Sequence, residues 1–226
     1  MDRAFLTNTE AVTELVLVRH GQQDYPKDVG RSTTADWVDP PLSEIGNRQA
    51  DAVGQSMVSL DISAVYASNL ERAHETGLQI ARHHGLDVTV LDQLREIELF
   101  RDLPKGTQLT DAVDPILLRG ARERWVRDRR WDVYPFSETG EEFRHRVLMA
   151  VEGILATHPG ERVVVACHGG VINAVTAAVL GVREDMFFRP AHASVHRVAA
   201  LGERRVIWSL NETHHLAAVD PALVTW

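Results

Sequence analysis

The sequence predicts an α/β fold, a three-layer α/β/α sandwich in which helices cover both faces of a mostly parallel sheet. Short apolar runs alternate along the chain with longer segments of helical periodicity, as in successive β-α-β units. Two of the runs, residues 14–18 and 162–167, lack polar alternation, which is typical of strands buried on both faces. The chain has 226 residues, so its core needs neither a disulfide nor a metal.

The alternation continues along the whole chain. Strands are expected at residues 14–18, 62–67, 88–91, 162–167, 194–201 and 204–210, before a C-terminal tail. Helices are expected from Ser43 to about Leu60, from about Asn69 to His84, over residues 113–130, from Thr139 to Thr157, and after Gly170 to about Leu180. An order of this kind produces a largely parallel sheet with a helix between successive strands.

Capping residues set the limits of the predicted helices. Ser43 is a favourable N-cap for the first helix, and Ser68 is placed to cap the second. Gly85 then provides a C-terminal stop. Thr139, with Glu142 three residues later, forms a capping-box pattern, so another helix is expected to begin there.

Two segments do not fit the alternation. Residues 22–41 are polar and contain several prolines, so they predict a loop too long to be a simple connection. We interpret residues 99–138 as an insertion or lid over the sheet, within a single domain that spans residues 1–226. Six arginines lie in residues 119–130; they form either a solvated helix face or a lid that contacts an anionic leaving group.

Composition argues against several classes of protein. The net charge of −8, from 24 basic and 32 acidic residues, disfavours nucleic-acid binding. No apolar run approaches the ~20 residues of a membrane span, and residues 1–14 show no secretory signal. Cys167 is the one cysteine, which fits a reducing compartment. We therefore expect a cytoplasmic protein without nucleic-acid or membrane partners, and a homodimer stays open.

Chemistry is expected where two strands end. Arg19-His20-Gly21 follows the first strand, and His168-Gly169-Gly170 follows the strand at 162–167. Ligands of open parallel sheets bind beyond the carboxyl ends of the strands, so both histidines belong to the functional edge. Imidazole can act as a nucleophile, and Arg72, near the start of a helix after a third strand, adds a guanidinium group. Together these residues predict a cationic pocket for phosphate.

The same residues resemble the motifs of a known family. Arg19-His20-Gly21, the segment from Ser68 to Thr76 and His168-Gly169-Gly170 are similar to motifs of the histidine phosphatase superfamily, in the branch of cofactor-dependent phosphoglycerate mutases and related phosphatases. The run Leu42-Ser43-Glu44-Ile45-Gly46, followed by Gln49-Ala50, also resembles that branch. The resemblance covers about residues 14 to 180. It implies a phosphoglycerate mutase-like fold with no dedicated metal and no cofactor.

The resemblance also implies roles for single residues. His20 would be the nucleophile that becomes phosphohistidine, and Arg19, Arg72 and His168 would hold the phosphoryl oxygens. Gly169 lets the ligand approach the backbone closely. The acidic proton donor of the family falls at Glu96, with Glu98 as the alternative, because the run after Glu96 departs from the family pattern. Gln23 could bind the phosphate through its amide.

The expected function is therefore the metal-independent hydrolysis of a small phosphorylated substrate, a phosphomonoester, through a phosphohistidine intermediate. One alternative is a mutase, which would return the phosphoryl group to its substrate. Another is a non-catalytic phospholigand-binding protein on the same fold. The complete set of two arginines and two histidines favours an enzyme, and selectivity is assigned to residues 22–41 and 99–138.

Other histidines are not expected to bind a metal. His83-His84 and His214-His215 are adjacent pairs whose side chains point in different directions. His192 and His196 have the spacing of metal ligands on a helix, but the residues around them indicate a strand, which breaks that geometry.

Overall fold

The computed structural model describes residues 12–26 and 32–226 of the chain. Its strands are β1 (Thr13–Arg19), β2 (Ala64–Ala67), β3 (Val88–Val90), β4 (Arg162–Cys167), β5 (Val195–Leu201) and β6 (Arg204–Glu212). Its α-helices are α2 (Thr34–Val38), α3 (Glu44–Ser56), α4 (Glu71–Ala81), α5 (Leu109–Ala112), α6 (Pro115–Asp128), α7 (Gly140–Thr157), α8 (Gly169–Leu180) and α9 (His214–Val219). Two short 3-10 helices are η2 (Asp92–Leu94) and η3 (Pro221–Leu223). Parts of the predicted 22–41 loop and of the segment examined for a secretory signal lie outside the described residues.

The six described strands form one sheet in the order β3-β2-β4-β1-β5-β6. The pairs among β1, β2, β3 and β4 are parallel, whereas β5 and β6 add two antiparallel pairs at one edge. The predicted mostly parallel sheet is therefore confirmed. β1 lies between β4 and β5, and its register pairs Arg19 with Cys167. The residues that follow these two strands consequently lie at the same edge.

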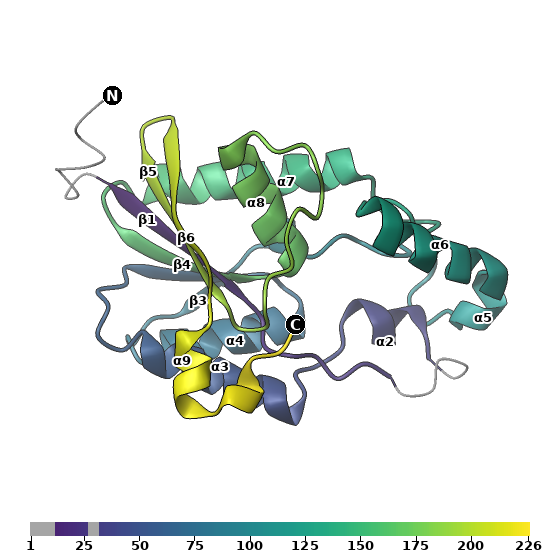
Figure 1. Ribbon diagram of the computed structural model, residues 1–226, viewed down its shortest axis with the longest axis horizontal. Coiled ribbons are helices and arrows are strands. Elements are labelled where there is room, and N and C mark those ends of the chain that lie inside the picture. Colours follow the sequence, from purple (N-terminus) through teal and green to yellow (C-terminus); the bar gives the residue numbers. More distant parts are fainter. Residues whose placement is uncertain (1–11, 27–31) are drawn as a thin grey trace.

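Helices cover both faces of the sheet (Figure 1), which confirms the predicted three-layer sandwich. Leu15 and Leu17 of β1 belong to the core on the side of α7 and α8, and Val16 and Val18 belong to the core on the side of α3, α4 and α9. All four side chains are completely buried. The uninterrupted apolar run of β1 thus follows from its place between two apolar layers.

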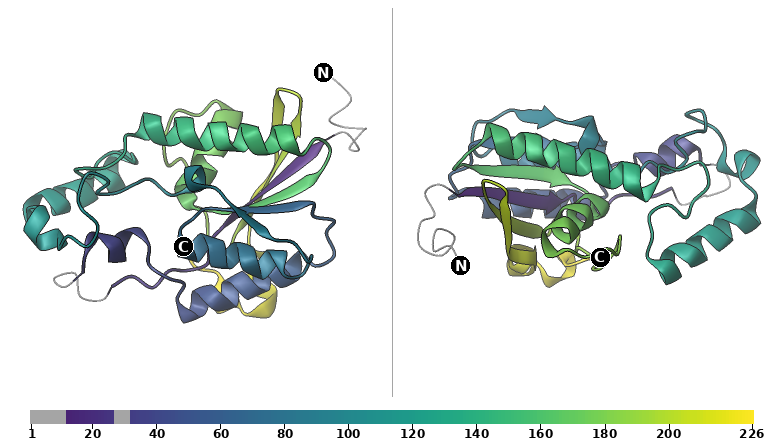
Figure 2. Two further views of the ribbon diagram at one scale, coloured as in Figure 1. Left: turned by 180° about the vertical axis from the view of Figure 1, so that it is seen from behind. Right: turned by 90° about the horizontal axis from the view of Figure 1, so that it is seen from above.

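A third, smaller core lies beyond the carboxyl ends of the strands. Figure 2 shows that α5 and α6 project past this end of the sheet, on the same side as α2. Phe100, Leu109 and Val113 form the buried part of this core, and Trp37 of α2 packs against them. The two segments that interrupt the predicted alternation therefore pack on each other.

The predicted N-cap at Ser43 and the capping box at Thr139 are confirmed. The predicted cap at Ser68 is wrong, because α4 begins only at Glu71 and the Ser68 hydroxyl accepts a hydrogen bond from the N–H of Leu70. The N–H of Glu71 is instead satisfied by the Asp39 carboxylate at 2.9 Å. A residue distant in the sequence thus supplies the cap.

The C-terminal tail that follows β6 is folded, since residues 214–223 form α9 and η3 and pack against α3. This segment covers the side of the sheet opposite to α7 (Figure 1). Leu216 and Leu223 are buried in the same core as Val16 and Val18. The last residues of the chain are therefore held against the body of the fold.

Two glycines fix the loop after His20 against α3. A Cβ on Gly46 would lie 2.0 Å from the carbonyl oxygen of Gln22, and a Cβ on Gly21 would lie 2.3 Å from the carbonyl oxygen of Gly46. Contacts this short do not occur, so only glycine permits the approach. The Leu-Ser-x-x-Gly run and the Arg-His-Gly run therefore depend on each other.

We predict that Gly46→Ala lowers the free energy of unfolding by about 1–3 kcal/mol, because the backbone must move to admit a methyl group. Gly153→Ala is the matched control, since a Cβ at Gly153 in α7 meets no atom within 4 Å. The control should stabilise the fold by about 0.5–1 kcal/mol. Urea unfolding measures both effects, and equal shifts for the two variants would contradict the prediction.

Candidate active site

The ends of β1 and β4 bring His20 and His168 together at the carboxyl edge of the sheet. Both side chains are buried, and their ring centroids are 5.0 Å apart with an angle of 58° between the rings. Cys167, which precedes His168, is buried as well, and burial raises the pKa of its thiol. The cysteine is a packing residue of the core, and the two imidazoles form the centre of the site.

The proton of the His20 ring is assigned by its hydrogen bonds. Nδ1 lies 2.7 Å from the carbonyl oxygen of Gly21, and because a carbonyl only accepts, Nδ1 carries the proton. Nε2 therefore holds a lone pair, and the Arg72 Nε–H points at it from 3.3 Å. Burial, followed by the charge of Arg72, keeps the pKa of His20 well below its usual value. The ring is neutral at pH 7, with Nε2 free to act as a nucleophile.

Two guanidinium groups flank this ring. Arg72, in the first turn of α4, is buried and donates from Nη1 to the carbonyl oxygen of Val38 at 3.1 Å, with Asp39 Oδ1 3.5 Å away. Arg19, at the end of β1, donates from Nη1 to the carbonyl oxygen of Pro190 at 2.5 Å. Burial lowers the pKa of Arg72 and lowers that of Arg19 to about 10. Both groups remain cations at neutral pH.

Several buried polar atoms of the site have no hydrogen-bond partner among the described residues. They are Arg19 Nε and both ring nitrogens of His168. Gln23 Oε1 is also buried without a partner in the described part of the chain, but its backbone pairs with Leu42 and no contact joins its side chain to this group. Gly169, the first residue of α8, borders the same space, because a Cβ there would lie 3.8 Å from Arg19 Nε. Buried polar groups without partners cost free energy. Together with two cations they define a site for an anion.

Of the two candidate acids, Glu96 is the one that lies against the second histidine motif. The N–H groups of Gly170 and Ile97 donate to its carboxylate at 3.0 and 3.1 Å. A Cβ on Gly170 would lie 2.1 Å from Oε1 of Glu96, so this glycine makes room for the carboxylate. Burial dominates the pKa of Arg19, and Glu96 is the first charge that opposes it. Glu98 instead pairs with Arg95 at 2.9 Å.

The Glu96 segment is held in place by residues that no sequence motif indicates. Arg146 of α7 donates to the carbonyl oxygens of Gln93 and Arg95, both at 2.8 Å, and to that of Glu96 at 3.1 Å. Its guanidinium also makes two hydrogen bonds, of 2.6 and 2.7 Å, to the buried carboxylate of Glu138. An arginine and a glutamate eight positions apart form no motif, so only the tertiary structure reveals this clamp.

His192, considered from the sequence only as a metal ligand, also lies beside the site. Its Nε2 lies 3.0 Å from Arg19 Nη2, and its ring centroid lies 6.1 Å from that of His20. His196 belongs to β5 and bonds elsewhere, to Ser194 Oγ at 2.9 Å. Within the described ranges, no three His, Cys, Asp or Glu side chains are grouped so that they could hold a metal ion. In the same ranges, no helix combines the length and apolarity needed to cross a bilayer.

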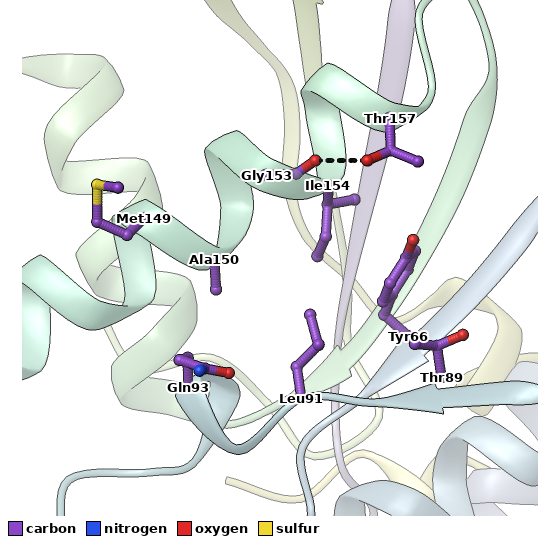
Figure 3. A pocket seen from close by; sticks show the side chains of 9 residues that line it. All are labelled: Tyr66, Thr89, Leu91, Gln93, Met149, Ala150, Gly153, Ile154 and Thr157. Atoms are coloured by element: carbon purple, nitrogen blue, oxygen red, sulfur yellow. Dashed lines mark hydrogen bonds between the residues drawn. The ribbon is translucent and has the colours of Figure 1, made fainter.

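A separate hollow of about 490 Å³ lies between α7 and the β2–β3 edge of the sheet (Figure 3). Its lining residues are Tyr66, Thr89, Leu91, Gln93, Met149, Ala150, Gly153, Ile154 and Thr157. The side chains of Leu91, Ala150 and Ile154 point into it, and the Thr157 hydroxyl donates to the carbonyl oxygen of Gly153 at 2.9 Å. The hollow contains none of the arginines and histidines described above and is distinct from the candidate active site.

The chain is an α/β sandwich whose carboxyl edge brings two histidines together with two arginines, a group of side chains suited to an anion such as phosphate. The profile of the histidine phosphatase superfamily (branch 1) matches residues 15–213, and the chain belongs to this superfamily. The resemblance in the sequence motifs is therefore confirmed.

Three similar proteins extend this finding. Phosphoserine phosphatase 1 of Hydrogenobacter thermophilus is 29% identical over 209 residues, which cover 91% of this chain and 95% of that protein. Metal-independent phosphoserine phosphatase of Arabidopsis thaliana is 27% identical over 222 residues, or 92% and 85% of the two chains. The native structure of mycobacterial glucosyl-3-phosphoglycerate phosphatase has a TM-score of 0.70 at 27% identity, and the match covers 89% of this chain and 100% of that one.

We predict that the fold loses stability as the pH falls below about 6.5, the pKa of an unperturbed histidine. Burial lowers the pKa of His192 and of His196 to about 3 and that of His215 to about 4. The unfolded chain therefore takes up protons that the folded chain does not, and the free energy of unfolding decreases with falling pH. Each group contributes about 1.4 kcal/mol per pH unit once the pH lies between the two pKa values.

Urea unfolding at pH 7.5, 6.5 and 5.5 measures this dependence. The variant His215→Gln should show a shallower pH dependence than the parent chain, because it removes one of the three groups. A free energy of unfolding that stays constant between pH 7.5 and 5.5 would contradict the prediction.

Proposed function

We propose that the chain hydrolyses small phosphomonoesters through a phosphohistidine formed on Nε2 of His20. The observation that carries this proposal is the lone pair of Nε2, which lies in a buried site between two guanidinium groups. Phosphoryl transfer needs positioning and stabilisation of negative charge more than covalent help from the protein. The site offers both.

In the first step, Nε2 of His20 attacks phosphorus and the ester P–O bond breaks. Arg19, Arg72 and His168 hold the phosphoryl oxygens, and the leaving alkoxide takes a proton from the carboxylic acid of Glu96. The phosphorylated ring becomes cationic, and its Nδ1–H keeps the hydrogen bond to the carbonyl oxygen of Gly21.

In the second step, the Glu96 carboxylate takes a proton from water, and the water oxygen attacks phosphorus. The P–N bond breaks, orthophosphate leaves, and His20 regains its lone pair. In this scheme Gly169 borders the phosphate, and the side-chain amide of Gln23 reaches it. Neither step uses a metal, in keeping with the name of the Arabidopsis relative.

We further propose that the substrate carries a carboxylate near its phosphate. The relatives named for phosphoserine and glucosyl-3-phosphoglycerate support this choice, because both compounds are phosphomonoesters of small organic acids. Arg189 supplies an exposed cation whose charge helps to lower the pKa values of Arg19 and His192 after the larger effect of burial, so it lies near the site. Residues 99–138 are proposed as the lid of a single domain. The cytoplasmic location stays a prediction, and the oligomeric state stays open.

Turnover itself depends on Nε2 of His20. Wild-type protein in the presence of EDTA should release orthophosphate from members of a phosphomonoester panel, and His20→Ala should release none above background, because no other nucleophile replaces Nε2. Esters with a carboxylate should outperform those without one. Acid-labile radiolabel on the protein after rapid quenching reports the phosphohistidine.

Other outcomes distinguish the alternatives. Transfer of label between positions of a phosphoglycerate without release of orthophosphate would identify a mutase. Binding of orthophosphate without any phosphohistidine would identify a non-catalytic protein. Release that stops in EDTA and returns with a divalent cation would overturn the metal-independent mechanism.

The assignment of Glu96 as the proton donor can be tested with leaving groups of different basicity. Glu96→Gln should lower kcat by about 10²- to 10⁴-fold for an alkyl phosphate, whose leaving group needs a proton, and much less for p-nitrophenyl phosphate. Glu98→Gln is the matched control and should leave the ratio of the two rates unchanged. If Glu98→Gln changed this ratio and Glu96→Gln did not, the assignment of Glu96 would be wrong.

A further inference from the structure

We infer that His192 is a positioning residue for phosphate binding: Thr225 fixes its tautomer, and its Nε2 accepts a hydrogen bond that orients the Arg19 guanidinium. The inference rests on the proposed function of the pocket and adds to it a support that lies outside the family motifs. It also gives residues 223–226, the last of the sequence, a role in orienting Arg19, which lies near its start.

Arg19 is the group that needs orientation. Its Nη1 donates to the carbonyl oxygen of Pro190 at 2.5 Å, and its Nη2 contacts His192 Nε2 at 3.0 Å. Its Nε is buried without a partner and lies beside Gly169 at the start of α8. Two of the three guanidinium nitrogens are therefore bound to acceptors of the protein. These two contacts fix the plane of the guanidinium, so that its remaining N–H groups point towards the anion site. A planar guanidinium binds phosphate well only when its fork is aimed correctly.

The donors and acceptors assign the tautomer of His192. Arginine has only N–H donors, so His192 Nε2 must be the acceptor, and the ring proton must be on Nδ1. Nδ1 lies 2.9 Å from Thr225 Oγ1 and donates a hydrogen bond to it. The same hydroxyl oxygen accepts a second hydrogen bond from Gln49 Nε2 at 2.8 Å. One path of hydrogen bonds thus runs from α3 through Thr225 and His192 to Arg19.

Burial and the neighbouring charges keep the His192 ring neutral. His192 is 4% exposed, and burial, followed by the charges of Arg19 and Arg189, lowers its pKa to about 3. A protonated ring would lack the lone pair and would repel the guanidinium. The neutral ring is therefore the form present at neutral pH.

Residues 223–226 are held firmly enough to fix the Thr225 hydroxyl. The N–H of His192 donates to the carbonyl oxygen of Thr225 at 3.0 Å. Gln49 Nε2 also donates to the carbonyl oxygen of Leu223 at 2.6 Å, and Arg189 donates to that of Trp226 at 2.7 Å. Figure 1 shows this end of the chain beside the segment that leads from α8 into β5.

A purely structural role for His192 would give a different result from a positioning role. His192→Leu removes the acceptor while keeping the side chain of similar size, and His192→Gln restores a side-chain carbonyl oxygen near the position of Nε2. Thr225→Val and Thr225→Ser form the corresponding pair for the second link. His196→Leu is the control for loss of a buried imidazole outside the anion site, since His196 bonds to Ser194 and to the N–H of Asn211.

The test is the dissociation constant of orthophosphate, measured by titration calorimetry on each variant of the full chain at one ionic strength, with kcat and KM on the best ester. His192→Leu should weaken orthophosphate binding and lower kcat/KM by about 10- to 100-fold, and Thr225→Val should have a smaller effect in the same direction. His192→Gln and Thr225→Ser should stay within about threefold of wild type. His196→Leu should lower the melting temperature without changing the dissociation constant.

Equal weakening by His192→Leu and His192→Gln, or an unchanged dissociation constant in His192→Leu, would overturn the inference. Because orthophosphate binding is measured without turnover, the two proposals fail separately. A wild-type chain that binds orthophosphate but hydrolyses no ester would overturn the proposed hydrolysis, while the series of dissociation constants would still decide the role of His192.

Discussion

The site depends on two guanidinium groups held close to one buried, neutral imidazole. Arg72 is buried, and the half-buried Arg19 has its Nε shielded from water, so both charges act strongly on an anion and on the His20 ring. The same burial that makes the pocket attractive to phosphate keeps Nε2 of His20 unprotonated. A solvent-exposed arrangement of the same residues would lose both effects, because water would screen the charges and hydrate the ring.

Close backbone approach makes this burial feasible. Gly21 and Gly46 let the loop after β1 pack directly on α3, and Gly170 leaves room for the Glu96 carboxylate at the start of α8. Gly21 and Gly170 belong to motifs that also carry a histidine of the site, and Gly46 packs directly on the loop after the first of them. The motifs are therefore short because the chemistry and the close packing occupy the same few residues.

The orientation of each charged group is set by partners outside the motifs. Val38 and Asp39 hold Arg72, and Arg146 with Glu138 holds the Glu96 segment. Each partner is far in the sequence from the group that it holds. Such supports need only one donor or acceptor at the correct point in space, so several residue types could meet the same need.

The sheet, its main helices and the strand-end positions of His20 and His168 could be predicted from the sequence, because the double-sided burial of β1 and the residues that end each strand are local patterns. Long-range contacts could not be predicted in this way. They make the Asp39 carboxylate, and not Ser68, the partner of the first N–H of α4, place the Glu96 carboxylate on the N–H of Gly170, and fold residues 214–223 back on α3. Each of these depends on a contact between residues far apart in the chain, whose distance no residue spacing can give.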